Sequence, residues 1–190
     1  MKNRFPLLLL LISLVKSNSY SQCTTNSIYF DGVYVNNSFS TLNDQVDIST
    51  NGPMSTIEEA VSYTIEAWVK RGHTTNPGGY ERILSKDYIY QFRIINDQFV
   101  GEIGNFSVNT PYPKDLKWHH LAFVRDANEQ LLKLFVYGEL KATAFDGSTF
   151  IANNNAMVCI GARNNGNKEI NELWKGYLRW LRVSKVLDIT

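Results

Sequence analysis

The 190-residue sequence has few cysteines, few prolines and no excess charge of either sign. With 19 basic and 18 acidic residues its formal net charge is +1, so no strong field favours nucleic acid or an anionic membrane as a partner. It also lacks internal repeats, heptads and low-complexity segments. The 44% hydrophobic and 19% charged residues are typical of a globular domain rather than of a disordered chain, and the length fits one domain better than two.

Long hydrophobic runs are also absent, except for one at the N-terminus. Lys2 and Arg4 precede an almost uninterrupted apolar run over 7–15, and a short polar stretch follows it. This order predicts a secretory signal peptide over 1–21, because the run is too short to span a bilayer as a helix. We therefore expect an exported mature domain, secreted or at the cell surface, with no transmembrane segment. A lipoprotein modified at Cys23 is the alternative.

Only two cysteines are present, Cys23 and Cys159. An exported chain with an even number of cysteines can form a disulfide, and this one would close a long loop. The chain-entropy model assigns such a loop about 4–5 kcal/mol of stabilisation. The other interpretation is a buried thiol at Cys159 and an unpaired Cys23.

Short segments with alternating apolar and polar residues occupy most of the mature chain. The clearest is 62–70, in which Tyr63, Ile65, Ala67 and Val69 share one side. Strands are predicted over 27–30, 44–48, 62–70, 82–85, 88–95, 98–103, 118–125, 131–137, 140–144, 157–162 and 176–183, and a helical turn over 56–61. So many turn-punctuated strands predict an all-β, two-sheet antiparallel jelly-roll sandwich, with a barrel as the alternative. A parallel α/β fold is not expected, because no amphipathic helices separate the strands.

The last predicted strand does not keep one alternating pattern. Leu178 lies an odd number of residues before Leu181 and Val183, so a regular strand would send these apolar side chains to opposite faces. A β-bulge near Arg179 and Trp180 would restore the pattern, because it adds one residue to a single strand.

Eight short motifs follow one another along the mature chain. They are YFDG at 29–32, QVDI at 45–48, YTIEAWVK at 63–70, RILSK at 82–86, WHHLAFVRD at 118–126, LKLFVYGEL at 132–140, CIGAR at 159–163 and KGYLRWLRVSKVL at 175–187. In this order they resemble the laminin-G-like domains of the concanavalin A-like lectin/glucanase superfamily. The resemblance implies a jelly roll with one concave sheet that binds carbohydrate or protein partners, often with calcium at one edge.

The resemblance points to Asp31, in the FDG turn, as a calcium ligand. Arg179 and Trp180 stand where relatives usually carry an acidic pair, and Tyr137 stands where they usually carry Asn. Calcium prefers several oxygen ligands, usually including carboxylates. We therefore assign no cofactor and keep calcium binding at Asp31 as a hypothesis to be tested. The other interpretation of Asp31 is a turn residue that hydrogen-bonds its own backbone.

A catalytic site is not expected. Glucanases of this fold use a pair of carboxylates close together on one strand, whereas Glu66 stands alone on its strand and Glu169 and Glu172 lie in a loop. His119 and His120 are neighbours on a strand, so their side chains point to opposite faces and are poorly placed to share one metal.

A sugar site requires an exposed aromatic ring for the apolar face of the sugar and polar groups for its hydroxyls. The loop-rich candidates are Tyr88, Tyr112, Arg163, Asn164, Asn165 and Trp174. Each aromatic ring among them can instead pack against its own sheet. The sequence therefore favours a binding module for extracellular polysaccharide or another glycan. The alternatives are an adhesion or structural module that binds protein or cell-surface partners, and an accessory domain of a larger secreted hydrolase.

Overall fold

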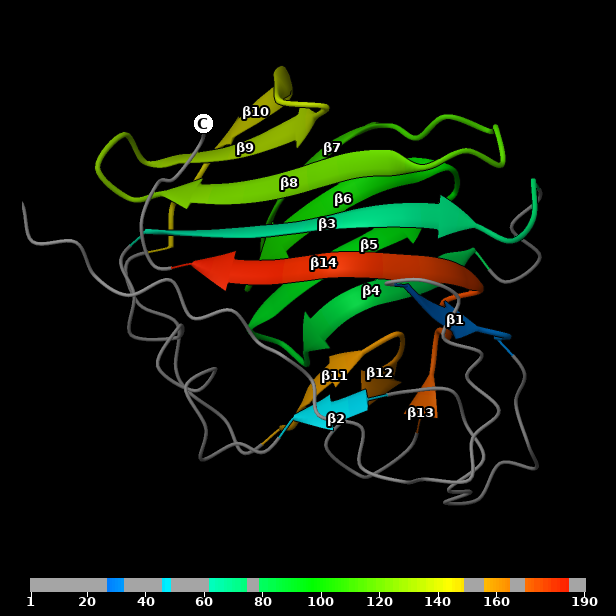
Figure 1. The fold of residues 1–190 in the computed structure, drawn as a ribbon. Coiled ribbons are helices and arrows are strands. Elements are labelled where there is room, and N and C mark those ends of the chain that lie inside the picture. The colour runs from blue at the N-terminus through cyan, green and yellow to red at the C-terminus, as the bar shows by residue number, and fades with distance from the viewer. Residues whose placement is uncertain are drawn as a thin grey trace, which may run out of the picture.

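The computed structural model describes residues 27–32, 46–48, 62–74, 79–148, 156–164 and 170–184, and within these ranges it contains strands but no helix (Figure 1). The first sheet contains, in spatial order, β1 (Ile28–Phe30), β14 (Gly176–Ser184), β3 (Tyr63–Arg71), β8 (His119–Asp126), β9 (Leu131–Val136) and β10 (Glu139–Phe145). The second contains β2 (Val46–Ile48), β11 (Val158–Ile160), β4 (Tyr80–Lys86), β5 (Tyr90–Ile95), β6 (Gln98–Ile103) and β7 (Phe106–Pro111). A ribbon pairs β12 (Arg163–Asn164) with β13 (Ile170–Asn171).

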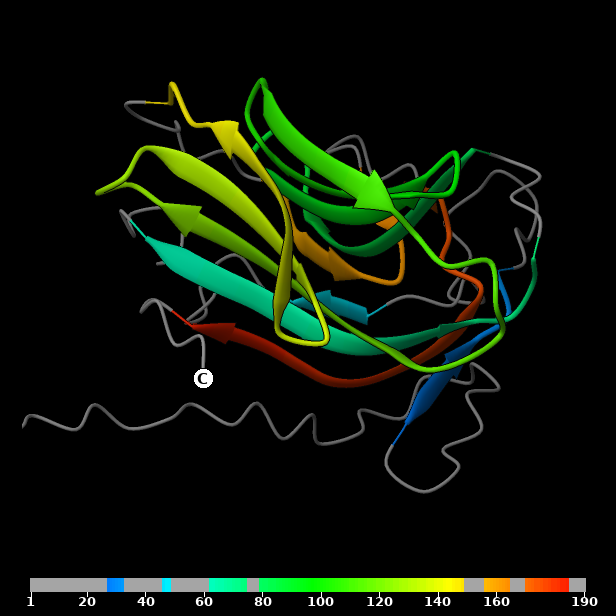
Figure 2. The same cartoon turned by 90° about the horizontal axis from the view of Figure 1, so that it is seen from above.

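The two large sheets are stacked layers that bow in the same direction (Figure 2). Every described strand pair is antiparallel, and neighbours in space are often distant in sequence, as in β1–β14 and β14–β3. This arrangement confirms the predicted all-β jelly-roll sandwich and excludes the barrel.

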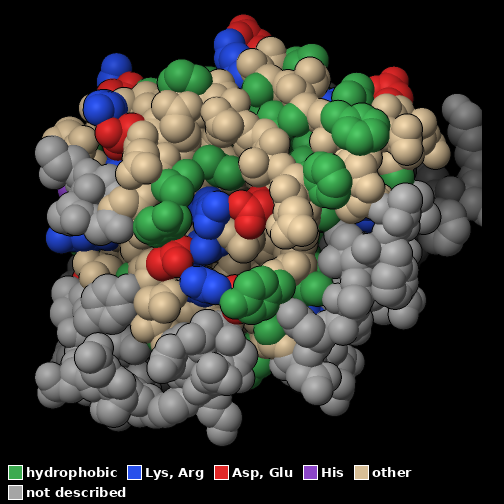
Figure 3. Space-filling view, turned by 180° about the vertical axis from the view of Figure 1, so that it is seen from behind, with side chains coloured by type: hydrophobic (Ala, Val, Ile, Leu, Met, Phe, Trp, Pro, Cys, Tyr) green, Lys and Arg blue, Asp and Glu red, His purple; other side chains and the backbone are tan. Residues whose placement is uncertain are grey.

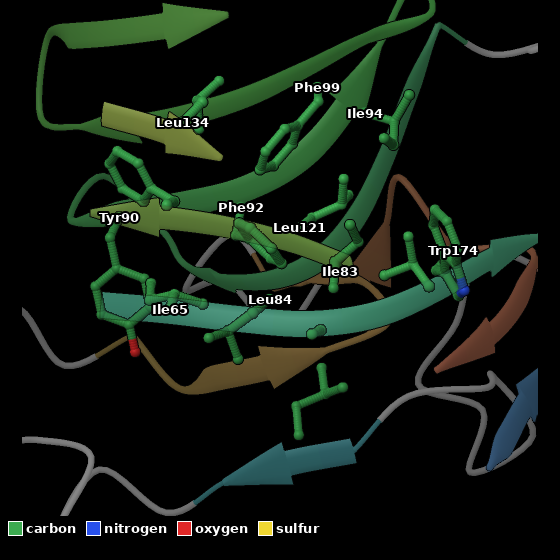
Figure 4. Close-up of a cluster of buried hydrophobic side chains, with 14 of the residues drawn as sticks. Ile65, Ile83, Leu84, Tyr90, Phe92, Ile94, Phe99, Leu121, Leu134 and Trp174 are labelled. Carbon is green, nitrogen blue, oxygen red and sulfur yellow. The ribbon is translucent and has the colours of Figure 1, made fainter. Parts of the chain in front are cut away.

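One hydrophobic core fills the space between the sheets. Ile65 on β3 and Leu121 on β8 face Phe92 on β5 and Phe99 on β6, and all four are fully buried (Figure 4). The rings of Phe92 and Phe99 meet edge to face with their centroids 5.2 Å apart. Alternate residues of the strands thus point inward and form the inner faces of both sheets, as expected for packed antiparallel sheets.

The bulge predicted in the last strand is present. The register of β14 against β3 shifts between Arg179, which pairs with Trp68, and Arg182, which pairs with Glu66. Trp180 lies in the shifted segment and has a φ of 52°. The extra residue lets Leu178 and Leu181 both pack against the core. This confirms the predicted bulge and the reason for it, which was to bring both apolar side chains to one face.

The structure contains one long strand that the sequence did not predict, and some predictions fall outside the described residues. Strand β7 pairs along its whole length with β6, from Phe106 opposite Ile103 to Pro111 opposite Gln98. The helical turn predicted over 56–61 and the signal peptide over 1–21 lie outside the described ranges.

Candidate functional site

The outer face of the second sheet carries a row of charged and polar side chains that we call the polar strip. Its members are Arg82, Asp87, Tyr88, Gln91, Arg93, Glu102, Arg163 and Glu172. Figure 3 looks onto this face, and basic and acidic side chains lie next to each other near its middle. The face is therefore polar but has little excess charge.

The register of β4 and β5 explains why these charges pair. Arg82 and Arg93 are directly opposite each other, and like charges in that position repel. Each guanidinium is compensated from another element, Arg82 by Glu172 and Arg93 by Glu102. Arg82 also donates to the Gln91 side chain. Burial lowers the pKa of Arg82, and the hydrogen bond to Glu172 opposes that effect.

Tyr88 and Arg163 form one end of the polar strip. Tyr88 lies in the tight turn between β4 and β5 with a φ of 61°, and its side chain is 71% exposed. The Arg163 guanidinium carbon lies 5.9 Å from the centroid of the Tyr88 ring. Arg163 Nε donates to Asp87 Oδ1 at 2.7 Å, and this hydrogen bond raises the pKa of Arg163. A second, longer bond of 3.3 Å runs to Glu172. Two predicted site residues, from distant parts of the sequence, thus lie together.

The expected exposure of Trp174, Tyr112 and Asn164 is wrong. Trp174 is fully buried in the core (Figure 4), and its backbone N–H donates to Gly161 O at 2.7 Å. Tyr112 is buried beneath the Arg71 guanidinium, and burial raises its pKa well above the ordinary value. Neither ring is an exposed platform for a sugar. Asn164 is buried in β12, and Asn165 lies outside the described residues.

The predicted metal ligand and disulfide remain predictions. Asp31 is exposed just after β1. No group of three or more His, Cys, Asp or Glu side chains is placed to hold a metal ion in the described ranges. Cys159 is fully buried on β11, whereas Cys23 lies outside those ranges.

The two neighbouring histidines point to opposite faces, as predicted. His119 is buried and hydrogen-bonded to Asp115, whereas His120 lies on the outer face of the first sheet and contacts Glu66 at 3.2 Å. Arg182 also binds Glu66. The hydrogen bond to His120 lowers the pKa of Glu66, which favours its ionised form. Glu66 is therefore an ion-paired strand residue and is poorly suited to act as a general acid at neutral pH.

The outer face of the first sheet holds a group of residues that the sequence did not bring together. Trp68 lies on β3, and Trp118 directly precedes β8. In the structure both rings contact Arg179, which also contacts Trp180. The predicted bulge was the only signal in the sequence that could have placed Trp180 on this face.

Comparisons with known proteins agree with the fold. Residues 39–187 match the profile of a family described as the concanavalin A-like lectin/glucanases superfamily. A putative carbohydrate binding protein from Bacteroides ovatus ATCC 8483 is 20% identical with a TM-score of 0.55, and the alignment covers 67% of this chain and 38% of that one. The CBM40 of the Ruminococcus gnavus IT-sialidase is 18% identical with a TM-score of 0.58, covering 76% and 91%.

A further similar structure is the botulinum neurotoxin serotype C1 binding domain. It is 15% identical with a TM-score of 0.59, and the alignment covers 76% of this chain and 38% of that one. The chain therefore spans well under half the length of two of these three proteins. No curated protein sequence matches it significantly. Within the part of the chain that the structure describes, no helix is long and apolar enough to cross a membrane.

Proposed function

The chain belongs to the concanavalin A-like lectin/glucanase superfamily, and we propose that it is an exported, non-catalytic module that binds carbohydrate. The observation that carries the proposal is the exposed Tyr88 ring beside Arg163 at the end of the polar strip. A structure of the Ruminococcus gnavus CBM40 bound to α2,3-sialyllactose supports the same ligand class. In this proposal residues 1–21 are the signal peptide and 22–190 form the binding domain.

The polar strip suits a sugar for two physical reasons. The flat apolar face of a pyranose can stack on Tyr88, which is exposed enough to accept it. The hydroxyls at the edge of the ring can then accept hydrogen bonds from the guanidinium of Arg163. Because Arg163 is already held by Asp87, little side-chain entropy remains to be lost on binding.

The same ion pairs argue against hydrolysis at this site. A glycosidase needs two carboxylates on either side of the scissile bond, one of them free to donate a proton. Asp87 and Glu172 both bind Arg163, and Glu102 binds Arg93. These carboxylates of the strip are thus ion-paired with guanidinium groups. The arrangement favours recognition of hydroxyl groups over acid–base chemistry.

The proposal is tested with the purified mature chain on a glycan array, followed by calorimetry with the best array ligand. Tyr88→Ala is expected to lower the affinity at least tenfold, and Arg163→Ala to act in the same direction. Phe145→Ala is the matched control, because Phe145 is a 63% exposed ring on β10, away from the strip. Tyr88→Ala and Phe145→Ala should keep the melting temperature of the wild type, whereas Arg163→Ala should lower it, because the buried Asp87 loses a paired cation.

A chain that binds no glycan, or whose Tyr88→Ala variant binds as well as the wild type, would contradict this site. Binding to a protein from the same cell surface, with an empty array, would favour the adhesion alternative. N-terminal sequencing of the exported protein tests the cleavage after Ser21.

A further inference from the structure

Three of the four tryptophans of the chain surround one arginine on the outer face of the first sheet. The Arg179 guanidinium carbon lies 4.3 Å from the ring centroid of Trp118, 4.9 Å from that of Trp180 and 5.1 Å from that of Trp68. The Trp68 and Trp180 rings meet edge to face with their centroids 6.5 Å apart. We call these four residues the tryptophan–arginine cluster.

The bulge in β14 creates this cluster. Arg179 and Trp68 are register partners, so their side chains leave the sheet on the same face. In a regular strand the next residue, Trp180, would point into the core. Instead it adopts a φ of 52°, and its side chain is 65% exposed. A bulky residue with a left-handed backbone is uncommon and strained, and such strain gathers at functional sites.

Arg179 differs from every other arginine in the described ranges. The six others, namely Arg71, Arg82, Arg93, Arg125, Arg163 and Arg182, each pair with a carboxylate. Arg179 has no ion pair in the described part of the chain, and its Nε is buried without a hydrogen-bond partner. A guanidinium carries five N–H donors. Three aromatic rings therefore hold a cation that has no carboxylate partner in the described ranges. Its accessible N–H groups can donate hydrogen bonds to a ligand.

The charges around the cluster have mainly one sign. Lys70 Nζ lies 5.5 Å from the centroid of the Tyr177 ring on the same face. Glu66 is the nearby acid, and Arg182 and His120 both bind it. The surface near Trp180 is thus aromatic and cationic, which is complementary to a ligand with both an apolar face and a negative charge.

We propose that the tryptophan–arginine cluster is a second binding site, for an acidic saccharide. The apolar face of the sugar ring stacks on Trp180, and the sugar carboxylate or sulfate accepts hydrogen bonds from Arg179. The bulge is what brings the ring and the cation side by side. This site lies on the face opposite the polar strip, so it goes beyond the proposed function and does not depend on Tyr88.

The test measures tryptophan fluorescence and calorimetric binding with three tetrasaccharides: tetragalacturonate, a heparin-derived tetrasaccharide and neutral maltotetraose. At least one acidic probe is expected to change the fluorescence and to bind at least tenfold more tightly than maltotetraose. Its affinity should fall as salt is added, because charge pairing contributes to it. Tetragalacturonate carries only carboxylates, whereas the heparin tetrasaccharide also carries sulfates. Binding of the heparin probe alone would therefore identify sulfate as the recognised anion, and binding of tetragalacturonate would show that a carboxylate suffices.

Variants separate this site from the polar strip. Trp180→Ala and Arg179→Gln should each weaken the acidic probe at least tenfold, whereas Tyr88→Ala should leave it unchanged. Arg179→Lys keeps the charge but loses the planar fork, so it should retain only part of the affinity. Thermal unfolding of each variant checks that the fold is intact.

Two results would overturn the proposal. One is that acidic and neutral tetrasaccharides bind equally or not at all. The other is that Tyr88→Ala abolishes acidic binding while Trp180→Ala keeps it, which would move the ligand to the polar strip. Loss of neutral glycan binding in Tyr88→Ala, with acidic binding retained, supports both sites independently.

Discussion

Arg71 and Glu81 form an ion pair of 2.7 Å whose side chains are only 1% and 4% exposed. Arg71 also binds Asp97 at 2.9 Å, and His73 binds the other oxygen of Glu81 at 2.7 Å. Arg71 is the last residue of β3 in the first sheet, and Glu81 is the second residue of β4 in the second. Charged groups therefore join the two sheets at one end of the sandwich, where a buried charge is costly unless it is paired.

Removing one partner of this pair should destabilise the fold strongly. We expect Arg71→Met to lower the free energy of unfolding by about 3–5 kcal/mol, because Glu81 is left buried without its main cation. Urea unfolding at neutral pH measures the loss. The double variant Arg71→Met/Glu81→Leu should lose less than the single one, since it removes both charges. A double variant as unstable as Arg71→Met would show that the uncompensated charge is not the cause.

Acid should weaken the contribution of Glu66. Its hydrogen bond to His120 lowers the pKa below the ordinary 4.5, burial opposes this effect and Arg182 adds to it. Because the pKa is lower in the folded state, the stabilisation is complete above about pH 4.5. It is lost as the pH falls through the folded-state value. Urea unfolding from pH 6 to pH 3 should show wild type and Glu66→Gln converging at the acid end. A constant difference would contradict the assignment.

Gly101 permits a close approach inside the core. A methyl group at this position of β6 would lie 2.1 Å from Cδ2 of the buried Phe123 ring. We therefore expect Gly101→Ala to destabilise the domain by about 1–3 kcal/mol through overpacking. Phe123→Leu should lower the free energy of unfolding less in the Gly101→Ala variant than it does in the wild type. A double-mutant cycle by urea unfolding measures the coupling, and strict additivity would contradict the predicted clash.

The backbone of Trp180 can be tested apart from its ring. Both Trp180→Ala and Trp180→Gly remove the ring, but only glycine adopts a φ of 52° without a steric penalty. The glycine variant should therefore be more stable than the alanine variant by about 1 kcal/mol. Chemical denaturation of the two variants gives this difference directly. Equal stability, or a more stable alanine variant, would argue against a strained bulge at this position.

The strands that the sequence identified are those with clear alternation. In β3, Ile65 and Val69 repeat at period two, and burial follows that pattern. The bulge in β14 was also predictable, because two apolar positions broke parity. Strand β7 was missed because its polar FSVNTP sequence resembles a loop. Its strand conformation depends on pairing with β6, a contact that local propensity does not contain.

The candidate site was only partly predictable. Tyr88 and Arg163 lie together because the β4–β5 turn approaches the start of β12, a tertiary contact between distant segments. Trp174 and Tyr112 also occur in loop-like sequence, yet both rings are buried. Flanking polar residues indicate that a segment is a loop, but they do not tell whether a ring in that loop points outward or inward.

By itself the sequence determined the all-β class and the inward and outward faces of the clearest strands, because both follow from residue types and spacing along the chain. The family was indicated by the resemblance of its ordered motifs. The tertiary structure alone decided which rings are exposed and which charges find partners. Arg179 and Trp118 meet only because β14 and β8 belong to the same sheet and the two side chains lie on the same face of it. Surface recognition depends on such distances between segments, and no local pattern encodes them.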